Sequence, residues 1–257
     1  MEVEPLPVSV AIITLNEEER LADCLQSVGF ASEVVIVDSG STDRTQEIAV
    51  EHGACFYSVP WQGFGIQKQT AIDYCSSEWI LVLDADERVS REAYDEIIDV
   101  LGSSESCAAY SLPRKNYFCG RWLKHAGWWP DRVVRLFRKG RAHMSSRLVH
   151  EALVVDGETG ELTQPLIHFA NRSLRQTLDK VNAYSSAGAE ELFRKGVSSS
   201  VPKAFGRALW AFVANYFLNK GFLDGGEGFI MAISDCMNVF FKYAKLRELH
   251  RQSKRVA

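Results

Sequence analysis

The first sixty residues alternate between short apolar runs and amphipathic stretches, and this pattern constrains the fold more than any other feature of the chain. Apolar runs rich in β-branched residues occupy 8–14, 33–37 and 54–59. The stretches between them, 16–28 and 43–52, have the apolar spacing of helices. Strands and helices in this order predict an α/β fold with a doubly wound, mostly parallel sheet.

The first of these helices has a recognisable start in the sequence. Asn16 is the expected N-cap, and Glu19 follows it at the spacing of a capping box. A further helix is predicted over 66–75, with Lys68 in its first turn. Lys68 is either a phosphate ligand or an ordinary surface lysine, and the sequence leaves both interpretations open.

The next apolar run, 79–83, ends at two aspartates, Asp84 and Asp86. Open α/β sheets bind ligands at the carboxyl edge of their strands, and on an extended chain side chains two apart point to the same side. Two carboxylates there suit Mg²⁺ or Mn²⁺, which commonly keeps substrate phosphates as further ligands. The alternative is that both aspartates cap the helix expected from Ser90.

Residues 113–141 form a cationic and aromatic stretch. They hold nine Lys or Arg, six aromatic residues and a single acid, Asp131. This mixture is typical of a surface that binds sugar against aromatic rings while cations hold phosphate. The alternative is a cationic surface whose tryptophans belong to the core.

The C-terminal region is predicted to be helical from Ser173. The net charge of the whole chain is −4, yet residues 203–257 carry nine Lys or Arg against four Asp or Glu. Two apolar stretches, 204–218 and 229–244, are too short or too charged to be simple membrane spans. They indicate amphipathic helices that lie in a membrane interface, or else a helical pair that packs on the sheet domain.

The six cysteines include no Cys-x-x-Cys pair, which argues against a zinc site and a thioredoxin motif. Reduced thiols in a cytoplasmic protein fit this pattern best. The N-terminus lacks the basic and then apolar pattern of a signal peptide. Nucleic-acid binding is not favoured, because the chain is acidic overall and carries no recognised nucleic-acid module.

Three short motifs give the clearest resemblance to a known family. They are Ala11–Glu17 (AIITLNE), Val35–Asp43 (VIVDSGSTD) and Leu81–Asp86 (LVLDAD). In this order they resemble the nucleotide-sugar domain of family 2 glycosyltransferases, which has the GT-A fold. Three further segments, Arg135–Arg138, His150–Glu151 and Lys220–Phe229, make nearly the whole chain similar to bacterial lipopolysaccharide core glucosyltransferases of the WaaE/KdtX type.

The resemblance implies roles for individual residues. Asp38 would accept a hydrogen bond from the uracil N–H, and Asp84 would lie near the ribose and the metal. Asp86 would ligate a divalent cation, Mg²⁺ or Mn²⁺, that bridges the donor diphosphate. The loop residues Thr14, Asn16 and Glu17 would border the nucleoside. The family is inverting, which implies one displacement at the anomeric carbon.

This chemistry requires positive charge at the leaving diphosphate and a base at the acceptor. Besides Lys68, the candidate cations are Arg135, Arg138 and Arg147. Glu151 is the favoured base and Asp131 the second candidate. His150 is a candidate third metal ligand, whereas structural hydrogen bonding is the preferred interpretation for His168.

The sequence therefore predicts a GT-A domain in two halves, 1–104 for the nucleotide sugar and 105–172 for the acceptor, with a helical extension at 173–257. The expected activity is hexosyl transfer from a UDP-sugar to a lipid-linked or lipopolysaccharide-core acceptor. The expected location is the cytoplasm or the cytoplasmic face of the inner membrane. The alternatives are a polyprenyl-phosphate glycosyltransferase and a non-catalytic nucleotide-sugar-binding scaffold.

Overall fold

The structure is a computed structural model that describes residues 5–103, 107–145, 152–171 and 173–256. The chain divides into two compact units. Unit 1 comprises Met1–Arg114 and Asp131–His168, and unit 2 comprises Lys115–Pro130 and Phe169–Ala257. Both predicted halves of the sheet domain thus contribute to unit 1, whereas Lys115–Pro130 joins the C-terminal helices in unit 2.

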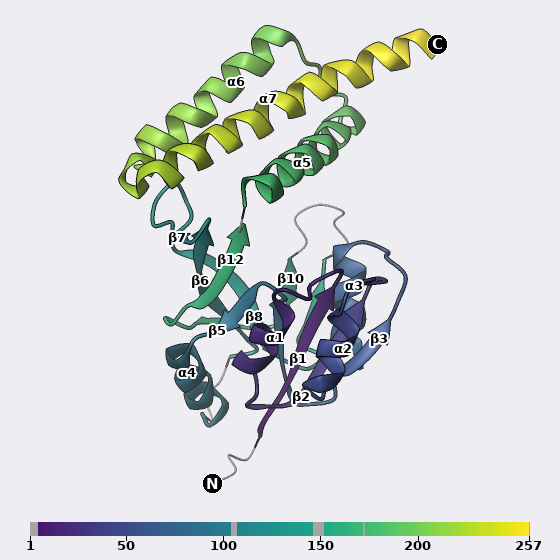
Figure 1. The fold of residues 1–257 in the computed structure, drawn as a ribbon, viewed down its shortest axis with the longest axis vertical. Helices are drawn as coiled ribbons and strands as arrows, with labels where there is room; N and C mark the ends of the chain where they lie inside the picture. Colours follow the sequence, from purple (N-terminus) through teal and green to yellow (C-terminus); the bar gives the residue numbers. More distant parts are fainter. Residues whose placement is uncertain (1–4, 104–106, 146–151, 172, 257) are drawn as a thin grey trace. The chain divides into compact units, whose positions relative to one another are not determined.

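The sheet begins with the parallel strands that the sequence predicts (Figure 1). Its strand order is β3-β2-β1-β4-β8-β6-β12-β5, with β7 and β11 each paired to β6. The strands on this path are β1 (Leu6–Thr14), β2 (Ala31–Asp38), β3 (Cys55–Ser58), β4 (Trp79–Asp84), β5 (Glu87–Val89), β6 (Ala109–Phe118), β8 (Asp131–Arg138) and β12 (Leu166–Asn171). The shorter strands are β7 (Arg121–Trp122), β9 (Ala142–Met144), β10 (Leu153–Val155) and β11 (Thr159–Glu161).

Helices cover both faces of the parallel strands in unit 1. The helices are α1 (Leu21–Ser27), α2 (Thr45–Glu51), α3 (Phe64–Tyr74) and α4 (Arg91–Leu101). Along β4, Leu81 and Leu83 pack in one cluster with residues of α1, α2 and α4. Ile80 and Val82 point the other way and pack with residues of α3. Because alternate side chains meet opposite layers, these strands are apolar at nearly every position.

Two helix starts test the sequence prediction. Ser90 caps α4, since its hydroxyl accepts the N–H of Ala93 at 3.1 Å, so neither Asp84 nor Asp86 is needed as a cap. The predicted N-cap at Asn16 is wrong. Asn16 adopts a left-handed φ of 55° in the loop, and α1 begins only at Leu21. The polar residues 16–20 are thereby left to build loop structure at the end of β1.

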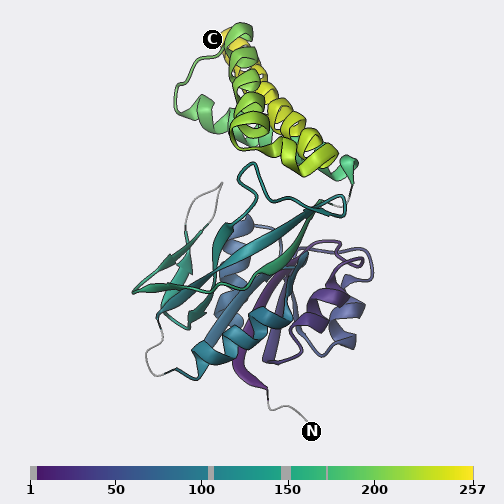
Figure 2. The ribbon, with the colours of Figure 1, turned by 90° about the vertical axis from the view of Figure 1, so that its left-hand side faces the viewer.

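Unit 2 holds the predicted C-terminal helices, α5 (Leu174–Arg194), α6 (Val201–Val213) and α7 (Gly225–Val256). A π-helical segment at Ala214–Leu218 and a 3-10 turn at Gly221–Asp224 connect α6 to α7. Figure 2 shows these helices gathered in one bundle. Their shared core includes Ala189, Ala204, Tyr243 and Leu246. None of the described helices is both long enough and apolar enough to span a bilayer.

Candidate functional site

The first polar cluster lies at the carboxyl ends of β1 and β2, where Thr14 and Asp38 are opposite each other in register. The Asp38 carboxylate accepts the Thr14 hydroxyl at 2.8 Å. It also accepts the backbone N–H groups of Gly40 and Ser41, at 2.8 and 2.7 Å, and the Ser41 hydroxyl. A carboxylate offers about four lone-pair sites. Asp38 therefore commits its acceptor capacity to holding the loop after β2.

The loops after β1 and β2 are bonded to each other. The Asn16 N–H donates to the Ser41 hydroxyl at 2.8 Å, and the Asn16 side-chain oxygen accepts the Thr42 N–H at 2.9 Å. The Glu17 N–H donates to the Thr45 hydroxyl at 2.8 Å. The predicted nucleoside-bordering residues thus belong to one rigid polar edge of the sheet.

Gln67 of α3 extends this edge and was not singled out from the sequence. Its side chain is fully buried, and its amide N–H₂ donates to the Ser39 hydroxyl and to the Val59 carbonyl, each at 3.0 Å. Its amide oxygen is buried without a hydrogen-bond partner. An unsatisfied buried acceptor is costly unless a ligand or water supplies a donor.

Asp84 ends β4 between two cations. The Lys68 ammonium is 2.8 Å from one carboxylate oxygen, and the Arg135 guanidinium is 2.6 Å from the other. Burial alone would raise the pKa of Asp84, but Arg135 and Lys68 together hold that pKa well below its usual range. Asp84 is therefore a permanent anion at this edge, and Lys68 is paired with it.

Arg135 is itself shared between two carboxylates. Its Nη2 also lies 2.7 Å from Glu87, whose side chain is fully buried. Glu87 additionally accepts the backbone N–H of Asp84 at 3.1 Å. Burial would lower the pKa of Arg135, but Asp84 and Glu87 raise it above its usual value. This buried ion cluster fixes the position at which β4 ends.

The chain turns sharply after Asp84, which separates the two aspartates of the motif. Residues 85 and 86 form a turn before β5, so the expectation of an extended chain from Asp84 to Asp86 is wrong. Buried Arg88 stabilises this turn by donating to the carbonyls of Ala85 and Glu87 at 2.9 and 2.8 Å. Asp84 and Asp86 consequently face different partners.

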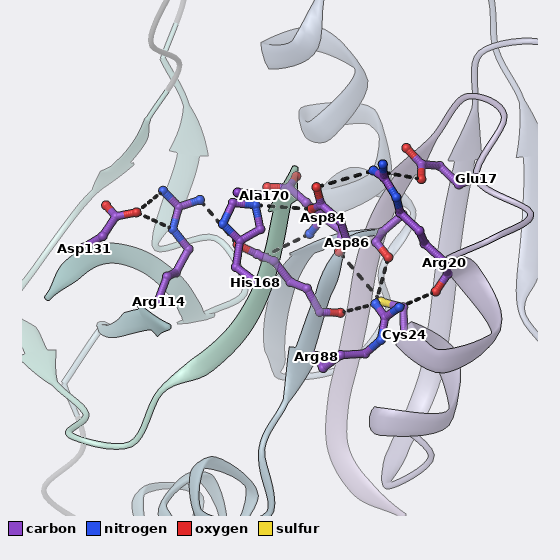
Figure 3. A network of polar contacts seen from close by, with 12 residues as sticks. Glu17, Arg20, Cys24, Asp84, Asp86, Arg88, Arg114, Asp131, His168 and Ala170 are labelled. Atoms are coloured by element: carbon purple, nitrogen blue, oxygen red, sulfur yellow. Dashed lines mark hydrogen bonds and ion pairs between the residues drawn. The ribbon is translucent and has the colours of Figure 1, made fainter. Parts of the chain in front are cut away.

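Asp86 lies between Arg20 and His168 (Figure 3). Its carboxylate is 3.6 Å from the Arg20 guanidinium and 3.5 Å from His168 Nε2. Arg20 also reaches Glu17 at 3.5 Å. His168 comes to Asp86 because β12 pairs antiparallel with β5, which sets His168 opposite Glu87. His168 therefore contacts a motif aspartate, which the sequence did not predict.

Asp131, the second candidate base, is held by Arg114 of β6. Its Oδ2 accepts from Arg114 Nε at 3.0 Å and from Nη2 at 2.6 Å, and Figure 3 shows this pair beside His168. Arg114 also approaches Glu87 at 3.5 Å. Asp131 is therefore connected through Arg114 to the cluster at the end of β4.

Arg138 does not belong to this site. It pairs with Glu78, lies over the Trp79 ring at 4.6 Å, and is opposite Trp79 where β4 begins. Because Asp84 ends the same strand, Arg138 is at the other end of β4, and its assignment to nucleotide-sugar binding is withdrawn. The candidates His150, Glu151 and Arg147 lie outside the described residues.

A divalent cation was predicted, and the side chains permit a restricted test. The described ranges contain no group of three or more His, Cys, Asp or Glu side chains placed to hold a metal ion. Asp84 is already neutralised by Lys68 and Arg135. Asp86 and His168 offer a carboxylate and an imidazole, donors that suit Mn²⁺ or a similar ion. The residues thus fit an ion whose remaining ligands come from a diphosphate.

Comparison with known proteins shows the family of the chain. Residues 9–154 match the model of glycosyl transferase family 2. The chain belongs to glycosyl transferase family 2. Its relatives in this family include the lipopolysaccharide core biosynthesis glycosyltransferase LpsC of Rhizobium meliloti (strain 1021), which is 31% identical over 260 residues, covering 96% of this chain and 94% of that protein.

A second family 2 relative is the uncharacterized glycosyltransferase RT0209 of Rickettsia typhi, 31% identical over 261 residues, covering 97% of this chain and 89% of that protein. Among solved structures, S. aureus TarS 1–349 in complex with UDP is 15% identical with a TM-score of 0.48, covering 96% of this chain and 92% of that chain. This structural likeness is too weak to transfer any residue role. The predicted family, the GT-A sheet and the C-terminal helices are confirmed by the family match and the fold.

Proposed function

We propose that this family 2 glycosyltransferase is an inverting hexosyltransferase that moves a sugar from a UDP-sugar to a lipid-linked or lipopolysaccharide-core glycan. The observation that carries the proposal is the edge at the end of β4. There Asp84 is held by Lys68 and Arg135, and Asp86, two positions further along the chain, faces His168. The similarity to LpsC along nearly the whole chain supports the choice of acceptor.

The donor nucleoside is assigned to the interlocked loops after β1 and β2. Asp38 builds this loop with Thr14, and Asn16 and Glu17 border it. Gln67 is the residue we add, because the N–H of a base would satisfy its unpartnered amide oxygen. In this assignment Asp38 positions the loop after β2, and Gln67 supplies an acceptor.

The leaving diphosphate is assigned to Lys68, Arg135 and a divalent ion on Asp86 and His168. Such an ion would neutralise the negative charge that develops on the leaving group. Lys68 and Arg135 lie at Asp84 on the same edge, where their donors could also reach phosphate oxygens. Arg20, which pairs with Asp86, is the group that would move when an ion binds.

The acceptor hydroxyl must lose a proton as it attacks, which requires a base. Glu151 remains our first candidate on sequence grounds. Asp131 is the candidate among the described residues, and Arg114 orients its carboxylate with two hydrogen bonds. A pH–rate profile of each Gln or Asn variant distinguishes the two, because loss of the base removes the ascending limb.

We also propose that the protein binds the membrane surface peripherally through unit 2. In α6 the small residues Ala204 and Ala208 are buried, whereas Phe205, Leu209 and Trp210 are at least half exposed. A helix packed only within a soluble bundle normally buries its large apolar side chains. This reversed amphipathicity supports insertion of the large side chains into an interface. All six cysteines are free, which supports the cytoplasmic face.

The test of the proposed activity is a donor panel. The purified full chain is mixed with UDP-, GDP- and CMP-sugars in Mn²⁺, Mg²⁺ or EDTA, and thermal stability and nucleotide release are measured. A UDP-sugar that raises the melting temperature only with metal supports the proposal, because a ligand bound to the native state stabilises it. Stabilisation by no nucleotide sugar, with or without metal, would favour the scaffold alternative.

A further inference from the structure

The hairpin of β6 and β7 in unit 2 has one buried and one outer face. Tyr117 and Phe118 pair with Trp122 and Arg121, and the connecting residues both have positive φ, as a tight primed turn requires. Since side chains alternate across a strand, Phe118 points to the buried face, where it packs with Leu123 and with Met231 of α7. Tyr117 and Trp122 therefore share the other face.

Aromatic rings and lysines gather on this outer face. Trp122 meets Trp129 edge to face at 5.4 Å between ring centroids, and Tyr117 lies 5.6 Å from Phe169. Two ammonium groups lie over the same indole. Lys115 Nζ and Lys124 Nζ are each 4.4 Å from the Trp122 ring centroid. We call Lys115, Tyr117, Trp122 and Lys124 the hairpin platform.

The two platform lysines have no carboxylate to balance them. Among the described side chains, no acid forms an ion pair with Lys115 or Lys124. The neighbouring acids are used elsewhere: Asp224 accepts the backbone N–H groups of Lys124 and His125 and the His125 ring, and Glu227 pairs with Arg121. Two like charges held at one ring repel each other, and a nearby anion would relieve that repulsion.

Trp122 adds a directional signal. Its indole Nε1 is buried and has no hydrogen-bond partner. A buried donor without a partner requires an explanation, and one explanation is a ligand acceptor. Among the described residues, the platform therefore offers an apolar ring, an N–H donor without a hydrogen-bond partner and two cations without a carboxylate partner. These are the groups that recognise a sugar ring, a sugar oxygen and an anionic substituent, respectively.

We propose that the hairpin platform binds an anionic sugar residue, one that carries a carboxylate or a phosphate, in the acceptor glycan. That the ligand is the acceptor rests on the proposed function; that it is an anionic sugar rests on the platform alone. Residues 115–124 fall in the stretch 105–172 that the sequence assigns to acceptor binding. The surface is separate in sequence from every residue assigned to the donor.

The experiment follows the indole N–H signals of the full chain by NMR. The chain has six tryptophans, so six signals are expected, and Trp122→Phe identifies the one from Trp122. Glucuronic acid, glucose 6-phosphate, glucose and inorganic phosphate are titrated separately, without donor. The expected result is a saturable shift of the Trp122 signal with the charged sugars. Glucose and inorganic phosphate should each leave this signal unshifted. The charged sugar that binds tighter identifies the substituent.

Two variants test the lysines. Lys115→Gln with Lys124→Gln should weaken binding of the charged sugar by at least about tenfold, the scale of one charge-assisted hydrogen bond. Lys203→Gln is the matched control, because Lys203 also lies near a ring in unit 2, 6.0 Å from the Tyr243 centroid. It should leave binding unchanged. Donor-dependent nucleotide release, measured separately, should persist in Lys203→Gln.

Each other outcome overturns the inference. An equal response to glucose removes the anionic requirement, and an equal response to inorganic phosphate removes the sugar. No shift of the Trp122 signal with any probe means that the lysines only cover the indole. Because these titrations omit donor and metal, they fail or succeed independently of the glycosyl transfer reaction.

Discussion

At the scale of single residues, Asp86 and His168 make the sharpest prediction. They come from different strands and meet only through the pairing of β12 with β5. If they hold the ion that neutralises the leaving diphosphate, Asp86→Asn should lower turnover by at least about 100-fold, as removal of one electrostatic stabiliser does. His168→Asn should weaken metal-dependent stabilisation by UDP more than about tenfold, since even outer-shell ligand partners cost that much.

The control is Asp95→Asn, which removes an exposed carboxylate of α4 that pairs with Arg91 at 3.2 Å. Turnover and thermal shifts with UDP are compared in Mn²⁺ and in EDTA. If Asp86→Asn retains both turnover and its response to metal, the ion is held elsewhere and the assignment of Asp86 fails.

Glu87 makes a separate prediction about stability. It is fully buried, and its carboxylate lies 2.7 Å from Arg135 and 3.5 Å from Arg114. Breaking a buried ion pair by removing one charge costs about 3–5 kcal/mol. Glu87→Gln should therefore lower the free energy of unfolding in urea by about 3 kcal/mol. Glu92→Gln, at an exposed position of α4, should have almost no effect, and equal stabilities of the two variants would contradict the role of Glu87.

At the scale of elements, Asp235 of α7 makes the stability of the α6–α7 helix pair depend on pH. Burial raises its pKa from 3.8 to about 6, although a hydrogen bond from Asn215 in the π-helical segment opposes this rise. The native state therefore binds more protons than the unfolded state between these values. The free energy of unfolding should fall as pH rises from about 4 to about 6, by at most about 3 kcal/mol.

Asp235→Asn keeps the side-chain size and removes the titration. We expect the variant to be more stable than the natural chain at pH 7 and equally stable at pH 4, by urea unfolding followed at several pH values. Glu248→Gln, in an exposed part of α7, should preserve the natural pH dependence. If the natural chain and Asp235→Asn show the same dependence of unfolding free energy on pH, folding does not raise the pKa of Asp235.

The elements also show what the sequence could predict. The strands β1, β2 and β4 follow from local apolar patterns, and so does the position of Asp84 at a strand end. The contact between Asp86 and His168 does not follow from local patterns. His168 is brought there by the pairing of two strands that are about eighty residues apart in the sequence. Arg138 was misplaced for the related reason that the register of β8 on β4 decides which of its arginines reaches Asp84. Local periodicity does not predict the register between strands that are distant in sequence.

At the scale of the whole molecule, the two compact units do not follow the order of the sequence. Residues 115–130 lie between two segments of unit 1 in the sequence, but they belong to unit 2 with the C-terminal helices. Their link is Asp224, which binds His125 through its ring at 2.9 Å. The sequence analysis places this stretch in the acceptor half, 105–172, and a local pattern does not reveal a contact between residues about a hundred positions apart.

The apolar surface of unit 2 leads to a prediction for the intact protein. Phe205 and Trp210 are each more than 60% exposed on α6, and the nearby charges include the cations Lys203 and Arg207. Aromatic side chains beside cations favour an interface with anionic lipid. The full chain should therefore sediment with vesicles containing phosphatidylglycerol, less so in high salt because salt screens the attraction.

Trp210→Glu should abolish this sedimentation, because it places a negative charge where the apolar side chain would enter the interface. The matched control is Trp61→Glu in unit 1, where the tryptophan is also about half exposed, at 48%, and meets Phe64 edge to face at 4.7 Å between ring centroids. That variant should sediment as the natural chain does. Equal loss in both variants would attribute binding to net charge, and sedimentation of Trp210→Glu at the natural level would show that α6 is not the surface that meets the membrane.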